Sequence, residues 1–155
     1  MKNNRKMPKA SLDAADHQIL AALNDNARIS MTDLGRLLGM SPQSAADRLR
    51  RLEDLTVISG FTVKLDREAL GLAVGAYIRI RPAMGELPRV TGLLAEIPEI
   101  VECDRITGDD CFIAKVFVAR IEDLERVIDR LIPYAQTNTS IIQSSPVRLR
   151  APKYS

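Results

Sequence analysis

A group of hydrogen-bonding side chains between Ser41 and Leu55 has the spacing of one helix face. Ser41 is suited to cap a helix, and the following proline is suited to its first position. Ala45, Leu49 and Leu52 form an apolar stripe at helical spacing. At about 100° per residue, the opposite face carries polar groups: Gln43, Asp47, Arg50 and Asp54, with Ser44 and Arg51 beside them. This chemistry suits hydrogen bonds to base edges and ion pairs with phosphates, although an ordinary solvated helix has the same pattern.

Positive charge is concentrated locally in the first part of the chain. The net charge is only +2, but residues 36–51 hold four arginines, including Arg48, and one aspartate. The N-terminal residues 1–11 carry four basic side chains and no acidic one. Such patches supply the salt-dependent part of DNA binding, whereas a basic tail by itself is often a solubilising end.

Other reactive residues are sparse. Asp109 and Asp110 could serve as acid–base groups or metal ligands, but acids beside a glycine more often support a turn. A carboxylate there also suits the ammonium group of a bound amino acid. His17 is the single histidine, and the two cysteines lack the partners of a zinc site, which leaves strand positions or a thiol switch as their roles. We therefore expect no catalytic residues, no metal and no cofactor.

Three short helices are predicted ahead of residue 55. Residues 12–26 have helical apolar spacing, with Asp13 as a plausible N-cap and Asp16 three residues later. Residues 31–38 form a second, short helix that stops at Gly39. Two short helices joined by a tight turn are typical of a helix-turn-helix, whose second helix enters the major groove of DNA.

The β-branched run 57–65, with Gly60 at a turn, predicts a hairpin that would make this a winged helix-turn-helix. The second half then alternates between strand and helix patterns. The expected order is strand 73–81, helix 87–97, strands 100–107 and 111–119, helix 124–131 and strand 137–149. This is a β-α-β-β-α-β, ferredoxin-like plan, which makes the whole chain α+β.

One face of that sheet is expected to carry both helices. We expect the other face to hold residues such as Val116, Val118, Ile142 and Ile78, or their neighbours, and to be covered by a second subunit. The predicted organisation is a basic tail at 1–11, a DNA-binding domain at 12–65, a linker at 66–72 and an effector and oligomerisation domain at 73–155. We expect no membrane span and no secretion signal, and a cytoplasmic location.

Taken in order, these segments resemble the leucine-responsive regulatory protein/AsnC (Lrp/AsnC) family of transcription regulators. The resemblance runs from Leu12 to about Arg150. It is carried by residues 12–20, 25–30, 34, 38–42, 48, 51–53, 57–61, 70–72, 101–103, 106–109, 137 and 139. Two positions depart from the family pattern: Asp47, where a basic residue is common, and Cys111, where an aspartate often precedes the aromatic residue.

The resemblance implies a homodimer that assembles further, with an octamer as the expected size. It also implies a small effector, usually an amino acid, bound near the turn after the second strand of the C-terminal domain. The expected effector residues are Thr107, Gly108, Asp109, Asp110, Thr137 and Thr139. The expected DNA-binding residues are Ser41, Gln43, Ser44, Asp47, Arg48, Arg50 and Arg51.

The sequence is thus interpreted as a transcription regulator that binds double-stranded DNA and responds to a small molecule. Two alternatives remain at this point. One is an architectural DNA-binding protein with little sequence preference or effector response. The other is an enzyme or amino-acid-binding module whose helical half only mediates assembly.

Overall fold

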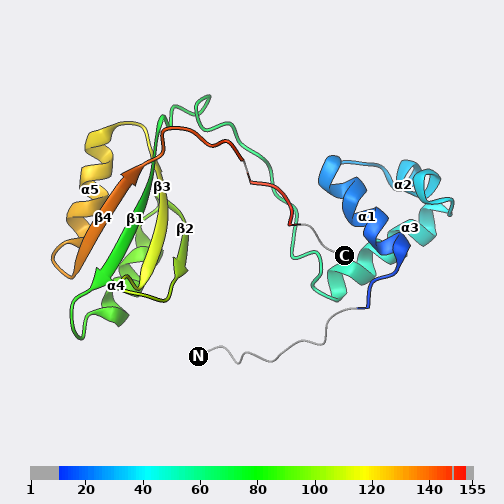
Figure 1. Ribbon diagram of the computed structural model, residues 1–155. Helices are drawn as coiled ribbons and strands as arrows, with labels where there is room; N and C mark the ends of the chain where they lie inside the picture. The colour runs from blue at the N-terminus through cyan, green and yellow to red at the C-terminus, as the bar shows by residue number, and fades with distance from the viewer. Residues whose placement is uncertain (1–10, 148, 153–155) are drawn as a thin grey trace. The chain divides into compact units, whose positions relative to one another are not determined.

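The computed structural model describes residues 11–147 and 149–152. The chain divides into two compact units, one made of residues up to Val63 together with those from Arg150 onward, and one from Lys64 to Leu149 (Figure 1). The basic tail expected at 1–11 lies, except for Ser11, outside the described residues. Among those described, no helix has the length and apolarity needed to cross a membrane.

The first unit contains three helices whose ends follow from their capping residues: α1 (Ala14–Asp25), α2 (Met31–Leu38) and α3 (Pro42–Asp54). Asp13 and Asp16 form a reciprocal capping box at the start of α1, which satisfies two backbone N–H groups. Gly39 ends α2 with a left-handed φ of 66°, a conformation that costs glycine little. The predicted helices are confirmed.

The core of this unit is small and is filled by one or two residues from each helix. Ile19, Leu34, Ala45 and Leu52 are completely or almost completely buried. Gly35 brings α2 close to the turn before α3, because a Cβ at this position would lie 2.7 Å from the carbonyl oxygen of Met40. The tight turn of the helix-turn-helix therefore depends on glycine at position 35, which has no side chain to clash with the turn.

The hairpin expected at 57–65 is wrong. These residues form no strand; the backbone N–H groups of Val57 and Ile58 instead bond to the carbonyl oxygen of Leu52. Phe61 and Val63 are more than half exposed. An isolated two-stranded hairpin is marginal unless a neighbouring surface buries its apolar side chains, and residues 60–65 are all exposed.

The second unit is a four-stranded antiparallel sheet with two helices. The strands are β1 (Val74–Pro82), β2 (Ile100–Arg105), β3 (Phe112–Val118) and β4 (Ala135–Ile141), in the order β2-β3-β1-β4. The helices are α4 (Leu87–Glu96) and α5 (Ile121–Leu131). This confirms the β-α-β-β-α-β plan. Both helices contribute to one apolar core against the sheet, including Val90, Leu94, Leu124 and Val127.

The last strand is shorter at its end than the predicted span of 137–149. It begins at Ala135, opposite Pro82 of β1, and ends at Ile141. Because β1 starts only at Val74, the chain runs out of partner backbone soon after Ile142, whose N–H bonds to the carbonyl oxygen of Gly75. A strand without a partner does not continue.

The expectation for the open face of the sheet is wrong for three of its four residues. Ile78, Val116 and Val118 are buried in the core beneath the helices, and only Ile142 lies on the open side, beside Phe117. The pairing register places mainly polar and charged side chains on that face: Tyr77, Arg79, Arg81, Glu102, Asp104, Lys115, Gln136, Asn138 and Ser140.

Phe117 is a large apolar side chain near one end of this open face, opposite Gly75, and it is buried. The guanidinium of Arg67 lies 3.7 Å from the centre of its ring, in the geometry of a cation–π contact. A Cβ at Gly75 would lie 2.7 Å from the same ring. The segment expected to be a linker thus contributes a side chain that shields the sheet.

Substituting Gly35 by alanine should destabilise the first unit by about 1–3 kcal/mol, because the new methyl group clashes with backbone that cannot move freely. Gly92→Ala in α4 is the matched control: its Cβ meets nothing within 4 Å. That substitution should stabilise the protein by roughly 0.5–1 kcal/mol. Urea denaturation followed by circular dichroism measures both. Equal effects of the two substitutions would contradict the role assigned to Gly35.

Candidate nucleic-acid interface and effector site

Helix α3 begins with a chain of hydroxyl contacts and presents polar groups to solvent. The Ser41 hydroxyl accepts a hydrogen bond from the backbone N–H of Ser44 at 3.1 Å, and the two hydroxyl oxygens lie 2.8 Å apart. Gln43, Asp47 and Arg50 are exposed on the next turns. These residues lie on one face, as their spacing predicted.

Asp47 connects the exposed side chains of this face. Its Oδ1 accepts a hydrogen bond from Gln43 Nε2 at 3.1 Å and a second one from Arg50 Nη1 at 3.1 Å. All three side chains remain open to solvent, so the contacts are weak and exchangeable. In contact with DNA, an amide, a carboxylate and a guanidinium suit adenine, cytosine and guanine edges respectively.

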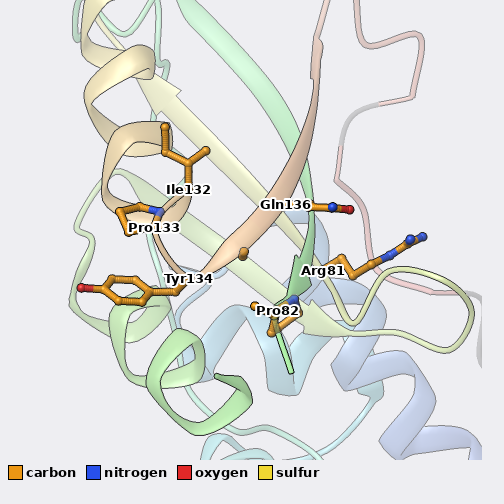
Figure 2. Close-up of a pocket in the computed structure, with 8 residues that line it drawn as sticks. Arg81, Pro82, Ile132, Pro133, Tyr134 and Gln136 are labelled. Atoms are coloured by element: carbon orange, nitrogen blue, oxygen red, sulfur yellow. The ribbon is translucent and has the colours of Figure 1, made fainter. Parts of the chain in front are cut away.

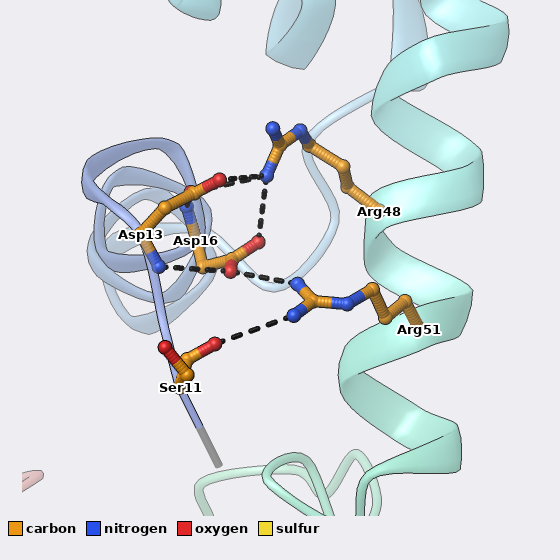
Figure 3. Close-up of polar contacts among 5 residues, drawn as sticks. All are labelled: Ser11, Asp13, Asp16, Arg48 and Arg51. Atoms are coloured by element: carbon orange, nitrogen blue, oxygen red, sulfur yellow. Dashed lines mark hydrogen bonds and ion pairs between the residues drawn. The ribbon is translucent and has the colours of Figure 1, made fainter.

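Arg48 and Arg51 point toward α1 instead (Figure 3). Arg48 Nη1 donates to both carboxylate oxygens of Asp13, at 3.0 and 2.8 Å, and to Asp16 Oδ1 at 3.0 Å. Arg51 Nη1 donates to Asp16 Oδ2 at 2.8 Å, and its Nη2 reaches the carbonyl oxygen of Ser11 at 3.3 Å. Both guanidinium groups are thus engaged by the start of the first helix.

The electrostatics of this cluster favour its charged form. Burial alone would raise the pKa of Asp16, which is fully buried, but the backbone N–H of Asp13 and the guanidinium of Arg51 outweigh it and lower that pKa. The pKa of Asp13 is lowered by the backbone N–H of Asp16 and by Arg48. The Arg48 pKa is raised, chiefly by its hydrogen bond to Asp13.

Sequence reasoning found the capping box of Asp13 and Asp16 but not their second role as partners of the α3 arginines. Those partners are separated by 32 to 35 residues along the chain. The available signal was that Arg48 lies next to the apolar stripe at helical spacing and Arg51 at the edge of the polar face rather than at its centre.

In the second unit, the turn between β2 and β3 is fixed to the neighbouring strand. The backbone N–H of Cys111 bonds to the carbonyl oxygen of Ile80 at 3.0 Å. Arg81 Nε donates to the carbonyl oxygen of Asp109 at 2.7 Å. Looser ion pairs join Arg81 to the carboxylates of Asp109 at 3.8 Å and Asp110 at 4.0 Å.

An open groove of about 370 Å³ lies beside this turn and combines charges of both signs. It is lined by Arg79, Arg81, Asp110, Gln136, Thr137 and Asn138. Of the expected effector residues, the structure brings Asp110 and Thr137 to the groove. Thr107, Gly108 and Asp109 belong to the adjoining turn, whereas Thr139 pairs with Ile78 and does not line the groove.

Arg79 and Arg81 were missed as groove residues. Their alternation with Ile78 and Ile80 was visible in the sequence, but the strand order that places them between the turn and β4 was not. A second hollow, of about 400 Å³, lies where β1 ends and β4 begins (Figure 2). Tyr134 lines this hollow, and its phenol oxygen accepts a hydrogen bond from Arg89 Nη2 at 2.6 Å. Arg89 itself is not one of the lining residues.

The described residues include no group of three or more histidine, cysteine or acidic side chains placed to hold a metal ion. Desolvation and the neighbouring Asp104 raise the pKa of Cys103, which disfavours the reactive thiolate. That shift argues against a thiol switch at Cys103.

The comparisons with known proteins match both the N-terminal and the C-terminal part of the chain to known domains. Residues 12–53 match the model of the AsnC-type helix-turn-helix domain, and residues 75–152 match the Lrp/AsnC ligand binding domain. These matches define a transcriptional regulator with a DNA-binding helix-turn-helix and a separate ligand-binding domain. The chain belongs to the Lrp/AsnC family.

Individual relatives extend over most of the chain. The transcriptional regulator LrpC of Bacillus subtilis is 34% identical over 133 residues, which cover 86% of this chain and 92% of that protein. The solved structure of LrpC has a TM-score of 0.83 at 33% identity, covering 87% and 96% of the two chains. A feast or famine regulatory protein from M. tuberculosis, complexed with L-methionine, has a TM-score of 0.85 at 25% identity, covering 92% and 99%.

Replacing Asp16 by asparagine should destabilise the first unit by about 2–3 kcal/mol, because two guanidinium groups lose their shared buried anion. The loss should fall below that of a fully buried pair, since the Arg48 and Arg51 side chains are 33% and 48% exposed. Asp33→Asn, which breaks an exposed pair with Arg36, is the control and should cost less than about 1 kcal/mol. Urea denaturation compares the two variants.

Urea denaturation of the same variants at several pH values checks in which direction the contribution of Asp16 to stability changes with pH. The pKa of Asp16 in the folded state lies below its ordinary value of 3.8, so its stabilising contribution is present above that pH and is lost as pH falls further. The stability of the wild type should therefore drop more steeply below pH 3.8 than that of Asp16→Asn. Parallel curves would contradict the role given to Asp16.

Proposed function

We propose that this regulator binds specific sequences in double-stranded DNA through α3 and responds to an amino acid bound by its C-terminal domain. The observation that carries the DNA-binding part is the exposed polar face of α3, presented by a helix whose other side is fixed to α1. An α-helix of this kind fits the major groove of B-DNA.

The proposed contact residues divide by position. Ser41 and Ser44, at the N-terminus of α3, are suited to phosphate oxygens, Gln43 and Asp47 to base edges, and Arg50 to a phosphate or a guanine. Arg48 and Arg51, which were also expected to contact DNA, are already bound to carboxylates. We assign to these two the placement of α3.

The groove beside the β2–β3 turn has the charges that an amino acid requires. Arg79 and Arg81 suit the ligand's carboxylate, and Asp110 suits its ammonium group. Thr137 and the amides of Gln136 and Asn138 supply neutral hydrogen-bonding groups. The complex of the M. tuberculosis relative with L-methionine supports this class of effector.

The proposed assembly is a homodimer that associates further, up to an octamer. The charged open face of the sheet supports this proposal, because its basic residues lie on β1 and β3 and its acidic residues, Glu102 and Asp104, lie on the edge strand β2. Effector binding between subunits would then alter the spacing of the DNA-binding units. We propose that the protein has no catalytic function. We also propose that it is located in the cytoplasm, with the chromosome.

The alternative is an architectural protein with little sequence preference. The two functions differ in the ratio of affinities for a selected sequence and for random DNA at the same salt concentration. A regulator should prefer its own sequence by roughly 10³-fold or more, whereas an architectural protein should not.

Removing the guanidinium of Arg50 should weaken DNA binding and reduce the dependence of affinity on salt. On a duplex of the selected sequence, where Arg50 would leave Asp47 for a phosphate, Arg50→Ala should lower the slope of log K against log salt by about 0.9. Arg126→Ala, which removes an exposed arginine from α5, serves as the charge-matched control. Fluorescence anisotropy across a salt series measures both; identical slopes for Arg50→Ala and the wild type would remove Arg50 from the phosphate contacts.

Binding of an amino-acid effector in the groove at the β2–β3 turn should raise the melting temperature of the protein. A ligand at 100 times its dissociation constant stabilises the folded state by about 2.7 kcal/mol. We expect one or a few of the twenty amino acids to do so, and Arg81→Ala and Asp110→Asn to abolish the shift. Arg126→Ala should preserve it. A response that survives both groove substitutions would place the effector elsewhere, and no response would favour the architectural alternative.

A further inference from the structure

Asp47 is an acidic side chain at the centre of a surface proposed to meet a polyanion. It is exposed and lies one helical turn after Gln43 and one helical turn before Arg50. One of its oxygens, Oδ1, accepts from both neighbours at 3.1 Å. In the part of the chain that the structure describes, Oδ2 accepts no hydrogen bond.

The charge of Asp47 offsets the cation that is most accessible on α3. Arg50 has a side-chain exposure of 66%, whereas Arg48 and Arg51 are held by α1. The exposed centre of α3 therefore pairs one positive with one negative charge. A phosphate approaching Arg50 must compete with the carboxylate of Asp47 and is repelled by it.

A carboxylate also discriminates between bases. The cytosine N4 amino group donates a hydrogen bond into the major groove, whereas guanine O6 and N7 and thymine O4 only accept. Adenine N6 also donates, but the acceptor N7 beside it repels a carboxylate. Oδ2 of Asp47 can therefore bind cytosine, but it opposes guanine and thymine. Bound at such an edge, Asp47 would release Gln43 toward a neighbouring base pair and Arg50 toward a neighbouring phosphate or base pair.

We propose that Asp47 is a specificity-determining residue that reads a cytosine and suppresses binding to DNA of other sequences. This inference rests on the proposed DNA-binding function. The Asp47 carboxylate lowers the general affinity for DNA and, at the same time, increases the discrimination between sequences.

The test compares full-length wild type with Asp47→Asn, which keeps the size of the side chain and removes its charge. Fluorescence anisotropy measures the affinity for a 30-base-pair duplex of scrambled sequence over a salt series. A second measurement selects bound sequences from a random duplex library. Asp54→Asn is the control, because it makes the same change on the exposed face at the end of α3.

Asp47→Asn should bind the scrambled duplex roughly threefold to tenfold more tightly at ~0.1 M salt, with a slope steeper by about 0.9 as Arg50 becomes free for a phosphate. The selected sequences should lose their cytosine preference at one position in each half-site. Asp54→Asn should change neither property. Asp47→Ser, with a smaller neutral side chain, repeats the test if the asparagine variant folds poorly by circular dichroism.

Two results would overturn the inference in different ways. If Asp47→Asn keeps the wild-type affinity for scrambled DNA and the same base preferences, Asp47 has no part in specificity, while the proposed function stands. If the wild type itself selects no sequence and binds no duplex at low salt, the proposed function fails together with the inference.

Discussion

Helix α3 is held against α1 by a carboxylate that solvent does not reach. Asp16 accepts from both Arg48 and Arg51, while its neighbour Asp13 binds Arg48 through two oxygens. A buried charge without partners is strongly unfavourable, so this arrangement permits few positions of α3 relative to α1. These contacts act together with the apolar cluster around Ile19, Leu34 and Leu52, which is non-directional. The ion pairs and the capping box share the same two side chains, so the start of one helix and the placement of another depend on each other.

The local elements were largely predictable because their signals are short-range. Ser41 and Pro42 begin α3, Gly39 ends α2, and the change from helical to alternating periodicity separates the two units. The failures concern pairing over long distances. The run at 57–65 has strand propensity but no strand partner among the described residues, and the expected last strand extends beyond the start of β1. Propensity indicates what a segment favours, whereas a strand also requires a neighbouring backbone.

The sites were predictable to different degrees for the same reason. One helix fixes the positions of Gln43, Asp47 and Arg50, so their common face follows from spacing alone. The groove in the second unit is assembled from β1, β4 and the β2–β3 turn, and only the strand order β2-β3-β1-β4 brings Arg81 between Asp110 and Gln136. The assignment of Ile78 and Val116 to the wrong face had a related origin, because alternation separates two faces but does not say which one the helices cover.

The division of labour along α3 has an evolutionary consequence. Arg48 and Arg51 carry the structural contacts, so replacing either one would leave the buried Asp16 with fewer partners. Gln43, Asp47 and Arg50 contact mainly one another at the surface, where substitutions cost little stability. Descendants of this chain are therefore free to vary the second set while keeping the first. Divergence of binding preference after gene duplication would need few steps, and none of them would pass through an unfolded intermediate.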